Sequence, residues 1–146
     1  MNSVILQTAS RNEWSQIAQL LQESDLPLDG AEDHIGDFVL AYQDHTLIGC
    51  AALERYGDSA LLRSVATHQA FRGKGFGQAL VRQLIDSARH AEIHTIVLLT
   101  TTADNFFPRF GFEVIPRMEA PDGVKDSAEF QGACPDSAIT MHLKLP

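Results

Sequence analysis

A glycine-rich corner between an apolar run and an amphipathic run is the feature that most constrains the fold of this chain. Residues 60–67 are typical of a β-strand, residues 72–77 carry three glycines spaced two apart, and the apolar residues of 76–88 repeat at helical spacing. Residues 95–99 follow, with the β-branched and leucine composition of a strand buried on both faces. A strand–helix–strand crossover of this length pairs its strands in parallel, so we predict an α/β (α+β) fold.

The corner has the properties of a phosphate-binding site. Glycine lets the backbone approach a ligand closely, and the following helix directs free N–H groups and its positive dipole end toward that ligand. Two common phosphate motifs do not fit. A P-loop needs Ser or Thr after its Gly-Lys pair, and the dinucleotide fingerprint needs glycine where this chain has Gln78. What remains is Arg72-x-x-Gly75-x-Gly77 at the start of a helix.

Composition and charge limit the class of ligand. The chain has 146 residues, 45% of them hydrophobic, which is typical of one domain, and we expect residues 1–146 to form it. The net charge of −8 argues against nucleic acid or an anionic membrane as a partner, because both require a basic surface. Residues 63–85 nevertheless hold no acid and four cations, Arg63, Arg72, Lys74 and Arg82. Such a patch in an acidic chain suits a polyanionic small ligand.

The sequence also predicts a cytoplasmic location and reduced cysteines. No apolar run is long enough to span a membrane, and residues 1–4 have no basic leader. Cys50 and Cys134 are too few for a disulfide framework or a four-ligand zinc site, so we expect free thiols and no metal.

The remaining elements follow from local periodicity. Ser10-x-x-Glu13 is a capping box ahead of an amphipathic helix, and residues 24–37 lose periodicity and predict a loop or short helix that can cover a site. Residues 103–111 predict a short helix closed by glycine. Strands are predicted at 4–8, 38–42, 46–54, 60–67, 95–99, 112–115 and 138–145.

Arg63 lies in the middle of the strand at 60–67. Strict alternation along this strand would place Arg63 on one face with Leu61, Val65 and Thr67, and Ser64 on the other. Buried arginine is rare without an anion. Arg63 therefore either pairs with a structural acid such as Glu54 or binds a substrate carboxylate.

The corner resembles the Gln/Arg-x-x-Gly-x-Gly/Ala motif of the GNAT N-acetyltransferase family. These enzymes also commonly carry A-x-x-F-Y-x-x-x-G-F, which Ala103, Phe106, Gly111 and Phe112 match. The family's tyrosine, which can protonate the departing coenzyme A thiolate, is Phe107 here. Because a thiol is a good leaving group, water or a threonine hydroxyl would suffice.

The resemblance implies the GNAT fold, a mixed central sheet of about seven strands flanked by about four helices and splayed between its two central parallel strands. It implies an N-acetyltransferase that uses acetyl-CoA as co-substrate and transfers acetyl directly to a small-molecule amine acceptor. GNAT proteins are often dimers, so a homodimer is the implied assembly.

Three stretches resemble one subgroup of that family, the arsenic-resistance-associated acetyltransferases: residues 63–65, 99–102 and the tail at 129–138. Residues 99–101 and the aromatic pair that follows also resemble the catalytic domain of N-acetylglutamate synthase. Both comparisons imply an acceptor that is similar to an amino acid.

The family also implies roles for individual residues. The amides of the corner and Gln78 would bind the pyrophosphate of acetyl-CoA, and the backbone of residues 65–67 would pair with pantetheine and polarise the thioester. The acetyl-CoA site would thus contain Val65, Ala66, Thr67, Arg72, Gly73, Lys74, Gly75, Phe76, Gly77, Gln78, Asn105 and Phe106.

Direct transfer requires a neutral amine, so a base or a chain of water molecules must take a proton from the ammonium ion. Glu54 and Ser64 are the candidate catalytic residues because they lie on adjacent predicted strands near the splay. Arg63 and Cys134 are the candidates for substrate binding. A ping-pong route through Cys134 is conceivable, although nothing in the sequence gives that thiol a base partner.

Two other functions are compatible with the sequence. The absence of an obvious base would suit a non-catalytic module that binds or senses acyl-CoA. The acidic loop at 25–37 would suit an acetyltransferase for protein or peptide amines.

Overall fold

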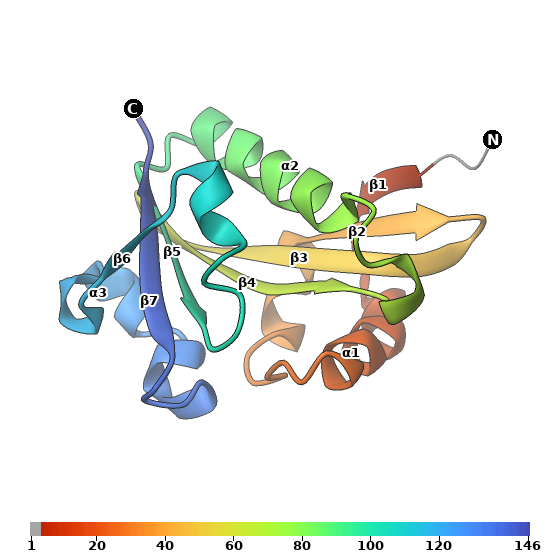
Figure 1. Ribbon diagram of the computed structural model, residues 1–146, viewed down its shortest axis with the longest axis horizontal. Coiled ribbons are helices and arrows are strands. Elements are labelled where there is room, and N and C mark those ends of the chain that lie inside the picture. The colour runs from red at the N-terminus through yellow and green to blue at the C-terminus, as the bar shows by residue number, and fades with distance from the viewer. Residues whose placement is uncertain (1–3) are drawn as a thin grey trace.

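A computed structural model describes residues 4–146, arranged as a seven-stranded mixed sheet between helical layers (Figure 1). The strand order is β1-β2-β3-β4-β5-β7-β6. The strands are β1 (Val4–Thr8), β2 (Phe38–Gln43), β3 (Thr46–Tyr56), β4 (Ser59–Thr67), β5 (Thr95–Thr100), β6 (Glu113–Ile115) and β7 (Ile139–Lys144). The helices are α1 (Trp14–Glu23), α2 (Phe76–His90) and α3 (Asp122–Lys125), with short turns η1 (Arg11–Glu13), η2 (Glu32–Asp37), η3 (Gln69–Phe71), η4 (Phe107–Phe110), η5 (Arg117–Glu119) and η6 (Glu129–Ala133). The prediction made on the first three residues lies outside the described chain.

Helix α2 covers one face of the sheet, and α1 lies on the opposite face (Figure 1). Apolar side chains of α2, among them Leu80 and Leu84, pack with Leu53 and Leu62 of the sheet in the larger core. Helix α1 packs its own apolar stripe on the other face in a second core. The periodicity of both helices therefore gives the two layers that the sequence predicted.

The two central strands are parallel and separate along their length. β4 pairs with β5 only from Ser59 opposite Thr95 to Leu61 opposite Val97, although β4 continues to Thr67. Every other pairing in the sheet is antiparallel among the residues described. The mixed sheet and its splay are thus confirmed.

A β-bulge at Ser64 makes the prediction of strict alternation wrong. Between paired positions, β3 contributes Ala51 alone, whereas β4 contributes both Ser64 and Val65. Ser64 accommodates the extra residue with a φ of 59°. The bulge reverses the alternation, so Val65 packs toward the α2 core while Ala66 joins the α1 core.

Residues 117–133 form more structure than their irregular sequence suggested. They contain α3 and two short turns, and they bury Val124, Ser127 and Glu129 against the face of the sheet opposite α2. None of the helices between residues 4 and 146 combines the length and apolar composition that crossing a membrane requires.

Candidate functional site

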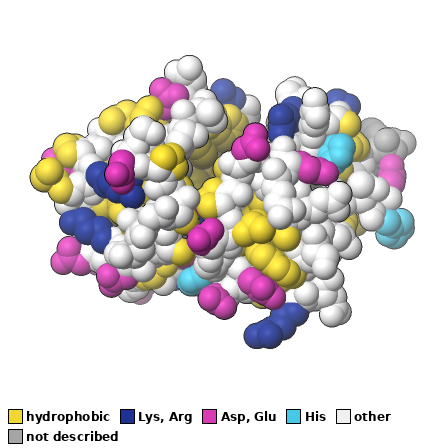
Figure 2. All heavy atoms as spheres, turned by 90° about the horizontal axis from the view of Figure 1, so that it is seen from below, with side chains coloured by type: hydrophobic (Ala, Val, Ile, Leu, Met, Phe, Trp, Pro, Cys, Tyr) yellow, Lys and Arg dark blue, Asp and Glu magenta, His cyan; other side chains and the backbone are white. Residues whose placement is uncertain are grey.

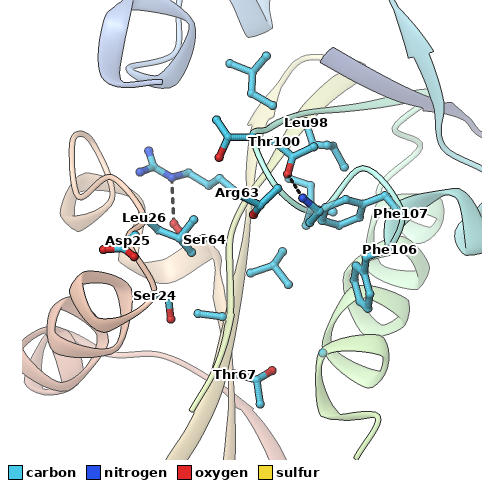
Figure 3. Close-up of a pocket in the computed structure, with 18 of the residues that line it drawn as sticks. Ser24, Asp25, Leu26, Arg63, Ser64, Thr67, Leu98, Thr100, Phe106 and Phe107 are labelled. Atoms are coloured by element: carbon cyan, nitrogen blue, oxygen red, sulfur yellow. Dashed lines mark hydrogen bonds between the residues drawn. The ribbon is translucent and has the colours of Figure 1, made fainter. Parts of the chain in front are cut away.

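A cavity of about 1100 Å³ opens where β4 and β5 separate. The glycine corner lines one end of this cavity, and the α1–η2 loop and the tail line the other. Figure 3 shows Arg63 and Ser64 on the side of that loop, with Phe106 and Phe107 on the other side of β4. Seen from the α1 side, the molecule is hollowed, with hydrophobic side chains at the bottom of the hollow (Figure 2). The cavity therefore joins both faces of the sheet.

The corner leaves the first-turn amides of α2 without a capping side chain. Gly75 caps the helix in the left-handed conformation with a φ of 86°, and Gly73 has a φ of 80°. Glycine occupies this region without the steric cost that other residues carry. Arg72 Nε donates to Thr67 O at 3.0 Å, which fixes the corner to the end of β4. The arrangement suits an anion at the helix N-terminus.

Eleven of the twelve residues predicted for acetyl-CoA line this cavity, from the end of β4 to Asn105 and Phe106. Lys74 does not line it, and its Nζ lies 5.6 Å from the centre of the Phe71 ring. Gly77 is where the corner comes closest to other elements, because a Cβ there would lie 3.5 Å from Thr67 Oγ1. The structure thus brings the predicted donor residues together with that one exception.

The guanidinium of Arg63 is bound by the protein itself. Its side chain is 0% exposed. Nη1 donates to Glu54 Oε2 at 2.9 Å and to the Asp29 carbonyl at 2.7 Å, while Nη2 donates to the Pro27 carbonyl at 3.0 Å. Nε donates to Ser64 Oγ at 3.1 Å. Of the two interpretations of Arg63, the structure therefore favours pairing with an acid over binding a substrate carboxylate.

Glu54 does not meet the requirements of the catalytic residue that the sequence suggested. It is 1% exposed, does not line the cavity, and binds Arg63 and the Tyr56 hydroxyl, which donates at 2.5 Å. Its partners hold it behind Arg63, outside the cavity. Ser64, the other candidate, lines the cavity, and its hydroxyl accepts a hydrogen bond from Arg63.

The buried acid that lines the cavity is Glu129, to which sequence reasoning gave no role. It lies in η6 with 4% of its surface exposed, and Oε2 is 3.5 Å from Arg63 Nε. Burial raises the pKa of Glu129 to about 7, although Arg63 opposes the shift. A carboxylate with this pKa can accept a proton near neutral pH. Only its burial in the folded tail distinguishes Glu129 from other acids, because the local sequence periodicity does not predict that burial.

Cys134 lines the cavity near Glu129 in the tail. Burial, and next the charge of Glu129, raise the pKa of Cys134 to about 12. The thiol is therefore protonated at neutral pH and is a poor nucleophile. This geometry disfavours a ping-pong route through Cys134.

Phe107 occupies the position where the family commonly has tyrosine. It is 6% exposed and packs against Phe106 and Phe112 at ring distances of 5.1 and 5.8 Å. The nearest hydroxyls in sequence belong to residues 100–102, which also line the cavity. Thr100 Oγ1 accepts a hydrogen bond from Ala103 N at 2.9 Å, which leaves its own proton free to donate.

No group of three or more His, Cys, Asp or Glu side chains suited to a metal ion occurs in residues 4–146. The cavity presents the backbone amides of the corner, the free edge of β4 and the buried Glu129.

Comparison with known proteins identifies relatives of this chain. A family model described as the acetyltransferase (GNAT) family matches residues 4–112. An amino-acid acetyltransferase of Neisseria meningitidis is 30% identical over 93 residues, which are 62% of this chain and 21% of that protein. An uncharacterized N-acetyltransferase of Chlorobaculum tepidum is 31% identical over 93 residues, 63% of this chain and 59% of that protein.

The solved structure of Neisseria gonorrhoeae N-acetylglutamate synthase, complexed with coenzyme A and N-acetyl-glutamate, aligns with a TM-score of 0.84. It is 25% identical, and the match covers 99% of this chain and 35% of that one. The chain spans about a fifth of the length of the amino-acid acetyltransferases that it matches. The names of the two Neisseria relatives refer to amino-acid acetylation or to N-acetylglutamate and do not mention arsenic.

Proposed function

Because this chain belongs to the acetyltransferase (GNAT) family, we propose that it transfers acetyl from acetyl-CoA to the amine of a small acceptor held beside Glu129. One observation carries the proposal: a single cavity runs from the glycine corner, through the gap between β4 and β5, to the Glu129 carboxylate. A donor at one end and an acceptor at the other would meet in that gap.

The donor half of the reaction follows from the corner and the strand edge. The first-turn amides of α2 would bind the pyrophosphate, with Arg72 adding charge. Beyond Leu61, β4 has no ladder partner on its β5 side in the described chain, so its N–H and C=O groups can pair with pantetheine as a strand would. An amide near Val65 would then face the thioester carbonyl and stabilise the oxyanion that forms during attack.

The acceptor half depends on Glu129. An ammonium ion has no lone pair for attack, so Glu129 takes one of its protons and the neutral nitrogen attacks the thioester carbon. The tetrahedral intermediate then expels the coenzyme A thiolate while its nitrogen loses a second proton, which water or a threonine hydroxyl can relay to the sulfur. Because Cys134 is protonated, we assign the acetyl group a direct path from sulfur to nitrogen.

Acetyl transfer can be tested by following release of the coenzyme A thiol over a panel of amines. The panel pairs free amino acids, including glutamate, with their carboxamides, and adds peptides and an arsenic-containing amino-acid analogue. Turnover of a free amino acid supports the proposal, and the carboxamides show whether the carboxylate matters. The relatives named as amino-acid acetyltransferases motivate this choice of acceptors.

The same panel separates the alternatives. Activity on peptides alone would replace the small acceptor with a protein amine. Tight binding of coenzyme A without turnover of any amine would contradict acetyl transfer and leave a binding module.

A further inference from the structure

Glu54 is a buried charge for which the reaction described above has no use. Arg63 Nη1 and the Tyr56 hydroxyl donate to its two oxygens at 2.9 and 2.5 Å, and His34 Nε2 lies 3.7 Å from Oε1. A carboxylate that is 1% exposed is costly to bury unless its partners compensate it. Its position on β3, directly behind the cavity wall, raises the question of what its charge does.

Arg63 is shared unequally between two carboxylates. Glu54 receives a hydrogen bond from Nη1 at 2.9 Å, whereas Glu129 Oε2 lies 3.5 Å from an Nε that donates to Ser64 Oγ instead. The remaining Arg63 bonds go to backbone carbonyls of the α1–η2 loop. The guanidinium is thus oriented by Glu54 and the loop, and it contacts Glu129 from one edge only.

We propose that Glu54 is a positioning residue of the reaction: by compensating and orienting Arg63, it leaves Glu129 able to accept the proton of the acceptor amine. This inference rests on the proposed role of Glu129 as the base. Without Glu54, Glu129 would lie beside an uncompensated buried cation, which strongly favours the ionised carboxylate. Such a carboxylate would hold a proton too weakly to take it from an ammonium ion efficiently.

The other charged groups near Glu129 do not substitute for Glu54. Cys134 is a neutral thiol in the tail, and Arg117 is a cation that lowers the pKa of Cys134, as Arg63 does. Asp25 of the α1–η2 loop also lines the cavity but is exposed to solvent, which screens its charge. Glu54 is therefore the acid that can offset Arg63 from within the protein, and it raises the pKa of Glu129.

The test is Glu54→Gln, which keeps a hydrogen-bond acceptor for Arg63 and removes the charge. We would titrate the side-chain carboxyl carbon of Glu129 by NMR, assigned by its absence from Glu129→Gln, and record kcat/KM against pH. The Glu129 midpoint and the acid limb of kcat/KM should both move down by about one pH unit, as expected for loss of a nearby like charge. The plateau should fall a few-fold because the base is weaker.

Glu13→Gln is the matched control, because Glu13 also accepts a hydrogen bond from a tyrosine hydroxyl, that of Tyr42, but lies away from the cavity. Glu13→Gln should leave the Glu129 titration unmoved. Glu54→Asp is the second variant if Glu54→Gln does not fold. It keeps the charge but withdraws it by one methylene, so a smaller shift in the same direction is expected.

An unmoved Glu129 titration in the folded Glu54 variants would overturn the proposal, and so would a loss of activity without displacement of the acid limb. Failure of the underlying function looks different. In that case Glu129→Gln would keep the kcat/KM of the wild-type protein, whatever Glu54→Gln does to the titration.

Discussion

At the scale of single residues, the environment of Glu129 determines its chemistry. The carboxyl is buried beside Arg63, a cation that is already paired with Glu54. The pKa of Glu129 is therefore about 7, above the usual range of glutamate. The same burial leaves Cys134 protonated. Burial therefore raises the pKa of two neighbouring side chains, and only that of Glu129 comes to lie near neutral pH.

The raised pKa of Glu129 predicts a specific pH dependence of stability. The folded-state value is about 7 and the ordinary value is 4.5, so between these pH values the folded protein holds a proton that the unfolded chain has lost. Rising pH therefore costs stability in that window. The wild-type protein should lose about 3 kcal/mol of its free energy of unfolding relative to Glu129→Gln as the pH rises from 4.5 to 8. Urea denaturation across this range measures it, and parallel curves for the two proteins would contradict the burial argument.

The protonated state of Cys134 predicts that no acetyl-enzyme forms. Incubation with acetyl-CoA in the absence of acceptor should leave the protein mass unchanged, and Cys134→Ser should still turn over. Alkylation by iodoacetamide at pH 8 should be slow for Cys134 and for Cys50, because burial raises the pKa of Cys50 to about 12 as well. A stoichiometric gain of one acetyl group on Cys134 would restore the ping-pong route.

Sequence reasoning predicted eleven residues that line the cavity but not the buried Glu129, and the reason is physical. Corner glycines and their flanking cations are local signals that a helix N-terminus explains. Glu129 gains its role from a tail that folds under the sheet, so nothing in the residues around it indicates that it is buried. The sequence also did not predict that the residues after Ser64 exchange faces of the sheet, because strict alternation assumes a strand without a bulge.

At the scale of elements, the glycine corner and α2 act as one unit. Periodicity predicted α2 well because its apolar stripe packs on a sheet face that alternates. The glycines of the corner are explained by the backbone conformation at the start of α2. Gly75 adopts a left-handed backbone there, and the helix amides that follow remain available to a ligand.

Gly75→Ala tests this unit. A Cβ at Gly75 meets no other atom within 4 Å, so the cost is conformational, about 1 kcal/mol of stability, together with a tilt of the first-turn amides. We expect the Kd for coenzyme A, measured by calorimetry, to rise about tenfold. Gly36→Ala is the control, because Gly36 also has open space but no left-handed backbone, and it should bind normally. Equal affinities for the two variants would show that the corner amides do not bind the donor.

At the scale of the whole molecule, the splay makes two layers into one site. β4 and β5 pair for three residues and then separate, which leaves backbone edges free inside a cavity that reaches both faces of the sheet. Charge is also distributed unevenly over the molecule. The corner carries the cations that suit a polyanionic donor, whereas the chain as a whole has a net charge of −8.

A ligand that bridges the splayed strands should stabilise the whole fold. At acetyl-CoA concentrations of about 100 times Kd, the free energy of unfolding should rise by about 2.7 kcal/mol. Hydrogen exchange should slow most at the free edge of β4 and at the start of α2. Protection confined to the exposed surface near Lys74, with β4 unchanged, would place the donor outside the cavity.

The most direct test of the central claim is the pH dependence of kcat/KM for the best acceptor, compared between the wild-type protein and Glu129→Gln. With Glu129 as the base, the wild-type profile should show an acid limb near pH 7, and Glu129→Gln should lose about a hundredfold in kcat/KM together with that limb. A Glu129→Gln protein that keeps both its rate and its acid limb would contradict the account.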